Sequence, residues 1–401
     1  MKTNNIPNFG PLQGVRVIHL TTTTAGPYCA CRMADFGADV IWVENPKGAD
    51  ICRFTKWNAE LERRNMRSIC LDSVSEEGMK VLIDLVKTSD ILIDSYKGGQ
   101  MSKWGLSDEK LHEINPKLII VHISGYGQTG VQEYVEKACY DPISQAFSGF
   151  MIQNGMPDKR PVPCPPGTAD YVTALQAAYA AMAALYRREK TGVGESIDVA
   201  QFESMVMIQA ASVSTYLNTG RLSGREGEHS TSCAGYGSYT CKDGNFVYML
   251  MIGFGPLRNA LALFGLSGRE EFAAVQTMVP LNSPGAPILE DAVNKFCSEH
   301  TAEEVEKIFN DNSIPCSRIF NFDELEYHPH YVAREVFTEW ENTAGEKIKG
   351  YNVFPKMSNN PGKVWRGIMK IGEDTGDILE ELGYSAEAIA DFQERGIAVK
   401  K

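Results

Sequence analysis

The sequence has 401 residues, of which 43% are hydrophobic and 22% are charged, and its formal net charge at pH 7 is −12. A chain of this length usually holds more than one hydrophobic core, so we expect two domains. The negative balance argues against nucleic acid and anionic membranes as partners, since both bind basic protein faces, but it allows a small anionic ligand held by a local group of cations.

Signs of export, membrane insertion and metal binding are weak. The amino-terminal stretch MKTNNIPNFGPLQG has no apolar segment of the signal-peptide kind, and the apolar stretch 171–186 is too short to cross a bilayer. Ten cysteines are scattered without C-x-x-C spacing, which predicts reduced thiols in a cytoplasmic protein. Only His328 and His330 are close together among the histidines, and no typical ligand pattern surrounds them, so we expect no metal site.

Strand and helix patterns alternate along the first third of the chain. Short apolar runs typical of buried parallel strands occur at 14–20, 39–45, 90–95 and 117–124. Helical spacing occurs at 25–38, 75–89 and 108–115. A strand, a helix and a strand within about thirty residues form a βαβ unit. The pattern predicts an α/β fold with a Rossmann-like large domain over residues 1–224.

The secondary-structure pattern of the sequence changes after the long alanine-rich helix. Two strand-like runs at 237–251 enclose the turn KDGN, which is typical of a β-hairpin, and helical patterns follow at 287–300 and 302–312. We therefore predict a smaller α+β domain over 225–325. The remaining segment, 326–401, contains a helical pattern and is expected to return to the large domain.

A βαβ start raises the question of a dinucleotide. Glu44 stands at the end of the second strand, where an acidic residue can hold a ribose. However, the turn after the first strand reads TTTTAGP and lacks the G-x-G-x-x-G glycines that let a pyrophosphate approach the backbone. This argues against a Rossmann-type oxidoreductase, although the carboxyl ends of the strands remain the expected place for a ligand.

Positive charge is available near those strand ends. The segment 53–67 is basic, and Arg63 and Arg64 within it are interpreted as part of a solvated basic face. Lys97 follows the strand at 90–95, so it is expected at a carboxyl end, where a phosphate-bearing ligand needs a cation.

Asp170 is the only charged residue between Arg160 and Arg187, and it stands directly before the alanine-rich helix. An Asp in that place is most often an N-cap, which accepts hydrogen bonds from the first backbone amides. The same place also suits chemistry, because a carboxylate feels the positive end of the helix dipole and the amides can stabilise an oxyanion. Spacing alone favours the cap and leaves the second role open.

Several segments, taken in chain order, resemble the sequences of one protein family. They include PLQGVRVIHL, MADFGADVIWVENP, SYKGGQMSKWGLSDEKLHEINPKLIIVHISGYGQTG, TADY, ALYRREKTGVGESIDVAQFE and IPCSRIFNFDELEYHPHYVAREVFTEW. Together they are similar to class III CoA-transferases over nearly the whole chain. Carnitine CoA-transferases look most similar, and bile-acid CoA-transferases are also similar, notably in IVHISGYGQTG and YTCKDG.

The resemblance implies a reaction and residues for it. CoA would pass from an acyl-CoA to a free carboxylic acid, with Asp170 as the nucleophile and no permanently bound cofactor. Lys97 matches a family lysine that contacts CoA. Many relatives have an arginine where this chain has Trp104, and Lys103 is a candidate stand-in for it. The resemblance also implies a homodimer of two interlocked chains.

The resemblance further suggests substrates. We expect L-carnitine as the acceptor and crotonobetainyl-CoA or γ-butyrobetainyl-CoA as the donor. A bile-acid or other acyl-CoA:carboxylate CoA-transferase is the alternative within the family. Outside this family, the alternatives are an oxidoreductase and a CoA-binding protein without turnover.

An aspartate suits such chemistry because its mixed anhydride and its thioester with CoA both keep the free energy of the donor thioester. With an ordinary pKa of about 3.9, the side chain is expected to be ionised at neutral pH and to need no general base.

Overall fold

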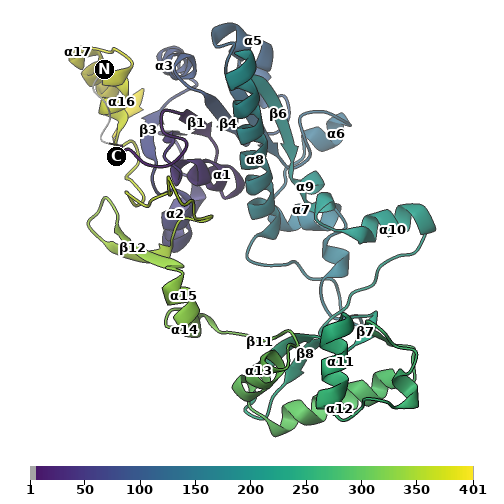
Figure 1. Ribbon diagram of the computed structural model, residues 1–401. Helices are drawn as coiled ribbons and strands as arrows, with labels where there is room; N and C mark the ends of the chain where they lie inside the picture. Colours follow the sequence, from purple (N-terminus) through teal and green to yellow (C-terminus); the bar gives the residue numbers. More distant parts are fainter. Residues whose placement is uncertain (1–5, 401) are drawn as a thin grey trace. The chain divides into compact units, whose positions relative to one another are not determined.

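The computed structural model describes residues 6–400, which form two compact units (Figure 1). The first unit consists of residues 6–150, 164–213 and 331–400, and the second of Met151–Pro163 and Ser214–His330. Each unit has its own buried apolar residues.

The first unit is built on a seven-stranded sheet with the order β14-β3-β2-β1-β4-β5-β6. Its strands are β1 (Arg16–Leu20), β2 (Asp39–Glu44), β3 (Arg67–Leu71), β4 (Ile91–Asp94), β5 (Ile119–Ser124), β6 (Glu195–Ala200) and β14 (Ala398–Val399). Strands β1 to β6 run parallel, and β14 joins the edge antiparallel to β3. The order 3-2-1-4-5-6 is that of the dinucleotide-binding α/β fold, so the predicted α/β, Rossmann-like class is confirmed.

Four of the parallel strands, β1, β2, β4 and β5, lie where the apolar runs predict them. The sequence pattern misses β3, because this strand begins with Arg67 and directly follows the basic segment. Every residue of β3 is nevertheless buried. Arg67 is tolerated there since its guanidinium pairs with Asp39 at 2.7 Å and with Glu381 at 2.8 Å.

Helices cover both faces of this sheet. Because alternate strand residues point to opposite faces, Val17 and Ile18 belong to different apolar clusters. The face of Val17 packs against α1 (Ala25–Ala34) and α8 (Thr168–Thr191). The face of Ile18 packs against α3 (Glu76–Lys87), α5 (Asp108–Ile114), α16 (Thr375–Glu381) and α17 (Ala386–Glu394).

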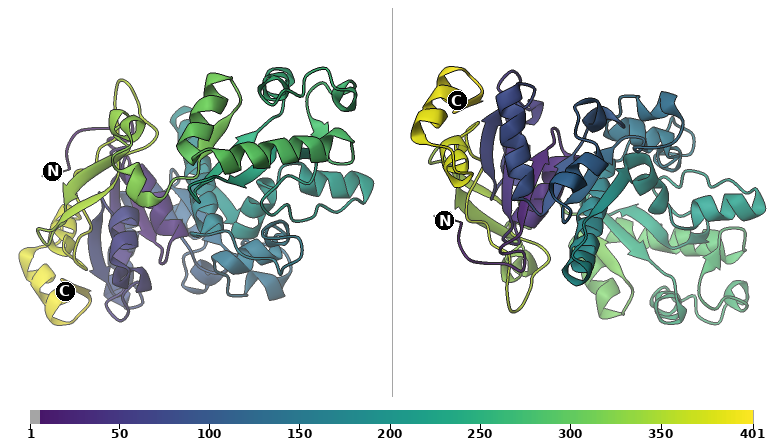
Figure 2. Two further views of the ribbon diagram at one scale, coloured as in Figure 1. Left: turned by 90° about the horizontal axis from the view of Figure 1, so that it is seen from below. Right: turned by 90° about the horizontal axis from the view of Figure 1, so that it is seen from above.

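The end of the chain completes the second face. Ile378 of α16 and Phe392 of α17 share the apolar cluster of Ile69 in β3. Figures 1 and 2 show these carboxyl-terminal helices, coloured yellow, beside the purple and blue strands of the sheet. Helices α16 and α17 therefore contribute to the apolar core beside β3.

The second unit contains the predicted hairpin. Strands β8 (Tyr236–Thr240) and β9 (Phe246–Leu250) pair antiparallel around the KDGN turn, and β11 (Cys316–Arg318) extends the sheet beside β9. Helices α12 (Gly285–Glu299) and α13 (Ala302–Asp311) supply buried residues to the same core. The unit thus combines helices with an antiparallel sheet.

Residues 6–400 carry no sign of a membrane span or of a metal site. None of their helices combines the length and the hydropathy that a bilayer span requires. No group of three or more His, Cys, Asp or Glu residues in this part of the chain is arranged to hold a metal ion. The ten cysteines, which all lie within residues 6–400, form no disulfide bond. The cytoplasmic location and the interlocked dimer stay predictions.

The prediction of a solvated basic face is wrong for Arg63 and Arg64. Their side chains are 0% and 1% exposed. Arg63 pairs with Asp50 at 2.6 Å, and Arg64 holds both carboxylate oxygens of Asp35 at 3.0 and 2.7 Å. A buried guanidinium requires such partners, which these two arginines find in segments distant along the chain.

This burial predicts a large effect of Arg64→Ala. The variant removes two charge-assisted hydrogen bonds from the buried Asp35 carboxylate and leaves Arg32, at 3.0 Å, as its remaining cation, so the free energy of unfolding should fall by about 3 kcal/mol. Denaturation in urea measures the change. Lys56→Ala is the control, because the pair of Lys56 with Glu346 is 50% exposed on both sides and should contribute at most about 1 kcal/mol. Equal losses in the two variants would contradict the assignment.

Candidate active site

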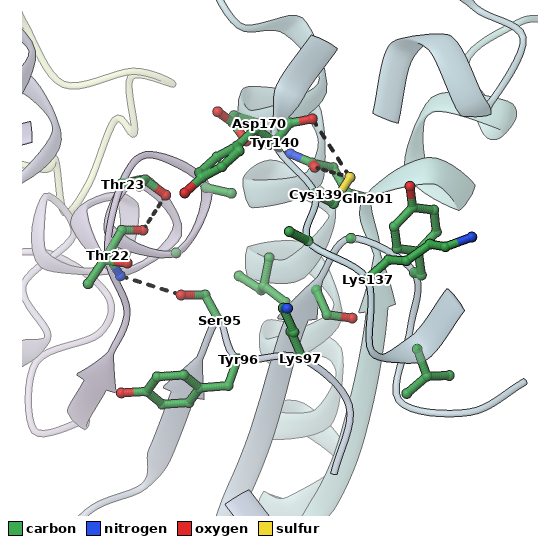
Figure 3. A pocket seen from close by; sticks show the side chains of 18 residues that line it. Thr22, Thr23, Ser95, Tyr96, Lys97, Lys137, Cys139, Tyr140, Asp170 and Gln201 are labelled. Atoms are coloured by element: carbon green, nitrogen blue, oxygen red, sulfur yellow. Dashed lines mark hydrogen bonds between the residues drawn. The ribbon is translucent and has the colours of Figure 1, made fainter. Parts of the chain in front are cut away.

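A pocket opens at the point where the strand order of the sheet reverses, between β1 and β4. In sheets of this kind ligands bind outside the carboxyl ends of the strands at this point. The cavity has a volume of about 210 Å³ and is bordered by the segments that follow β1, β4, β5 and β6 (Figure 3). Its polar lining includes Thr22, Thr23, Ser95, Tyr96, Lys97, Tyr126, Lys137, Cys139, Tyr140, Asp170 and Gln201.

Asp170 lies in this pocket but does not cap its helix, so the N-cap interpretation is wrong. Helix α8 begins at Thr168, and its N-cap is Gly167, which makes no side-chain capping bond. The cap comes instead from Asp141, whose Oδ1 accepts hydrogen bonds from the backbone amides of Ala169 at 2.6 Å and Asp170 at 3.3 Å. The side chain of Asp170 is therefore free of capping and belongs to the first turn of the helix.

The same contacts correct a second expectation. The two amides that we expected to stabilise an oxyanion already donate to Asp141. Asp141 is the first residue of α7 (Asp141–Phe147), and Gln145 of that helix donates to its second oxygen at 2.7 Å. The capping carboxylate is thus held in place from both sides.

The partner of Asp170 is Gln201, whose Nε2 donates a hydrogen bond to Oδ1 of Asp170. Gln201 directly follows β6 and begins α9 (Gln201–Met207). Its other amide atom, Oε1, accepts a hydrogen bond from Ser144 Oγ at 2.7 Å, so the amide nitrogen faces the carboxylate. Sequence reasoning misses Gln201, although a polar residue directly after a parallel strand is a signal that could have found it.

Lys97 reaches the same cavity. It follows β4, as predicted, and its side chain is exposed. Figure 3 shows Lys97 and Asp170 around one cavity, with Lys97 well below Asp170 in that view. The structure therefore brings these two predicted site residues together.

Lys103 and Trp104 do not line the cavity. Lys103 ends the short helix α4 (Gln100–Lys103), and its Nζ lies 3.7 Å from a carboxylate oxygen of Glu136. The indole ring of Trp104 stands edge-on to the ring of Tyr96, with centroids 4.7 Å apart, and Tyr96 lines the cavity. Trp104 thus supports the wall of the pocket from behind.

Glu44 does not serve as a free ribose ligand. Both of its oxygens accept hydrogen bonds from Arg53, at 2.7 and 2.6 Å, and Ser68 donates to the same carboxylate. A buried carboxylate with these partners has no oxygen left for a nucleotide. This agrees with the missing glycine fingerprint.

Comparison with known proteins identifies the family. A model of CoA-transferase family III matches residues 12–375. The chain belongs to CoA-transferase family III. It is 40% identical over 398 residues to the bile acid CoA-transferase BaiK of Clostridium scindens. This match covers 98% of this chain and 91% of that protein.

Solved structures agree with this assignment. A CAIB/BAIF family protein from Brucella suis matches with a TM-score of 0.80 and 28% identity, over 94% of this chain and 100% of that one. Rv3272 from M. tuberculosis matches with a TM-score of 0.79 over 93% of this chain and 100% of that one, and at 22% identity it shows the shared fold. The predicted family is confirmed, and the protein is a CoA-transferase.

The pocket of the transferase changes the acidity of Asp170. Burial, followed by the negative charge of Asp141, raises the pKa of Asp170 from 3.8 to about 7. The hydrogen bond from Gln201 acts in the opposite direction, and the charge of Glu62 adds to the rise. The expectation of an ordinary pKa is therefore wrong, because the sequence shows neither the burial nor the carboxylates that fold against Asp170.

A charged trio supports the segment that carries Lys97. His122 of β5 lies with Nδ1 2.6 Å from Asp94 and with Nε2 3.0 Å from Asp108. Burial lowers the pKa of His122, but the hydrogen bonds to Asp108 and Asp94 outweigh it and raise this pKa to about 10. Asp94 also accepts a hydrogen bond from the backbone amide of Tyr96 at 3.1 Å, which holds the start of the segment.

The raised pKa predicts how Asp170→Asn affects stability. The folded state binds the proton of Asp170 more tightly than the unfolded state does, so between about pH 4 and pH 7 the wild type loses stability as the pH rises. Asn cannot ionise and escapes this loss. The melting temperature of Asp170→Asn should therefore exceed that of the wild type by several degrees at pH 8, and the difference should shrink towards pH 4.

Calorimetric melting over this pH range measures the difference. Asp158→Asn, which alters an exposed carboxylate, serves as the control and should show a small difference at every pH. An Asp170→Asn variant that is less stable than the wild type at pH 8 would contradict the raised pKa of Asp170.

Proposed function

We propose that the transferase moves CoA from an acyl-CoA to a free carboxylic acid through covalent intermediates on Asp170. The supporting observation is a carboxylate that has no role in capping its helix, is held by Gln201 and lies in the pocket at the strand ends. Lys97 in the same pocket supplies a cation for the phosphates of CoA.

The reaction has four steps. A carboxylate oxygen of Asp170 attacks the thioester carbonyl carbon, and the CoA thiolate leaves, which gives a mixed anhydride. The thiolate then attacks the aspartyl carbonyl carbon and releases the donor acid, which gives an aspartyl-CoA thioester. The acceptor carboxylate attacks this thioester and forms a second anhydride, and the expelled thiolate opens it at the acceptor carbonyl. Asp170 is restored, and the acceptor leaves as its CoA thioester.

The side chains of the pocket have distinct roles in this scheme. Gln201 binds one oxygen of Asp170 and leaves the other for attack. When the aspartyl carbonyl is attacked in turn, the Gln201 amide is positioned to donate to its developing oxyanion. Asp141 keeps the first turn of α8 in place and also raises the basicity of the nucleophile.

For the substrate we propose a bile-acid type of carboxylic acid in preference to carnitine. The bile acid CoA-transferase BaiK shares 40% identity over 98% of this chain, which supports the bile-acid alternative over our first expectation of carnitine. A panel of acceptor acids offered with one labelled acyl-CoA donor decides between the two.

The nucleophile predicts the fate of Asp170→Asn. The amide keeps the shape of the side chain but lacks the attacking oxyanion, so kcat should fall by about a thousandfold or more. In the wild type, hydroxylamine added during turnover should convert one aspartate to its hydroxamate, and mass spectrometry should place it on the peptide GTADYVTALQ. Asp158→Asn should keep wild-type turnover. An active Asp170→Asn variant, or a hydroxamate on another carboxylate, refutes the mechanism.

A second prediction concerns the phosphates of CoA. Lys97→Ala removes a cation from the pocket and should raise KM for the acyl-CoA about tenfold or more, with a smaller change in kcat. Lys103→Ala, outside the cavity and beside Glu136, is the matched control and should change KM less. Steady-state kinetics with varied acyl-CoA separates the two constants. A fall in kcat with unchanged KM in Lys97→Ala would show that Lys97 does not bind CoA.

A further inference from the structure

A second cavity borders the pocket of Asp170. It has a volume of about 360 Å³, and the two cavities share Tyr126 and Val135 in their walls. Four aromatic rings surround it, namely those of Tyr126, Tyr134, Phe147 and Phe202. The reaction scheme does not use this cavity, although it adjoins the pocket that Asp170 lines.

The two cavities are built by the same short helices. Helix α9 begins with Gln201, which binds Asp170, and the next residue, Phe202, lines the aromatic cavity. Helix α7 begins with Asp141, which caps α8, and ends with Phe147. A substrate whose carboxyl group reacts at Asp170 can therefore place its body against the aromatic rings.

Phe147 lies at the centre of the aromatic wall. Its ring contacts those of Tyr126, Tyr134 and Phe202, with centroids 5.0 to 5.3 Å apart. The contacts with Tyr126 and Phe202 are edge-to-face, at 82° in both cases. Phe147 is nevertheless 46% exposed and lines the cavity, so part of its apolar surface is free for a ligand.

The charges around the cavity select among ligands. A quaternary ammonium group needs open ring faces. Here Nζ of Lys137 already lies over the ring of Tyr134, 3.9 Å from its centroid, and its charge would repel a second cation. The carboxylates of Asp198 and Glu203 line the same cavity and can accept hydrogen bonds from hydroxyl groups. The cavity thus suits an apolar body with hydroxyls better than a cation.

We infer that this aromatic cavity is the subsite for the acyl group and takes a rigid, apolar body that carries hydroxyl groups. The inference rests on the proposed function, because it needs the reacting carboxyl group at Asp170. The rings provide contact area, and the two rim carboxylates accept hydrogen bonds from the hydroxyls.

Phe147→Ala tests the subsite. The measured quantity is the ratio of kcat/KM for choloyl-CoA, a hydroxylated steroid thioester, to kcat/KM for acetyl-CoA, which is too small to reach the rings. Loss of a ring contact of this size should lower the ratio about tenfold or more. Phe147→Tyr keeps the ring and should restore the ratio. Phe322→Ala, at a ring that is 87% exposed and outside the cavity, should leave the ratio as in the wild type.

The outcomes separate this inference from the proposed function. An unchanged ratio in Phe147→Ala, with active enzyme, overturns the subsite and leaves the chemistry of Asp170 intact. If the wild type transfers CoA from neither thioester, the proposed function fails, and equilibrium dialysis with labelled cholate still tests the subsite. Weaker cholate binding by Phe147→Ala than by the wild type supports the subsite, and equal binding overturns it. A selective loss of L-carnitine binding in the same variant also overturns it.

Discussion

The cap that Asp141 places on α8 is the contact on which the site depends. It satisfies the first amides of the helix from outside, so the side chain of Asp170 is released from the role that its sequence position suggests. It also brings a second negative charge close to Asp170, which together with burial raises the pKa of Asp170 to about 7. The cap thus explains why the side chain of Asp170 is free of capping, and it adds to the rise in pKa that burial causes.

Sequence patterns predict those parts of the fold that follow from local rules. The apolar runs of β1, β2, β4 and β5 and the KDGN hairpin lie where predicted, since periodicity and turn chemistry act over a few residues. The sequence does not predict the start of α8, because the capping residue Asp141 lies 28 residues away from the amide of Ala169. The sequence does not predict the burial of Arg64 either, because its partner Asp35 is 29 residues away. Local sequence rules cannot predict contacts between residues that are distant in the sequence and meet only after folding.

Some site residues carry a local sequence signal, and others do not. Lys97 could be placed by its position after a strand, and Asp170 by its isolation before a helix together with the family resemblance. Gln201, by contrast, becomes meaningful only when β6 is known to end beside α8. His122 reads as an ordinary residue of a buried strand, although it joins Asp94 and Asp108 behind the segment of Lys97. Supporting residues of this kind carry no local signature because their partners come from neighbouring strands of the sheet.

The partial burial of Asp170 serves the proposed chemistry in two ways. Removing a carboxylate from water makes it more basic, and a more basic oxygen is the better nucleophile once it is ionised. Asp170 is only partly buried, and in the proposed scheme the bound acyl-CoA would exclude the remaining water from the anhydride and the thioester, whose hydrolysis would waste the energy that the transfer must conserve. An exposed aspartate would be ionised more fully, but it would be less basic, and water would compete with CoA for its acylated form. A destabilised carboxylate is therefore what a reaction that must avoid hydrolysis requires, and the fold maintains it with one neighbouring carboxylate and one amide.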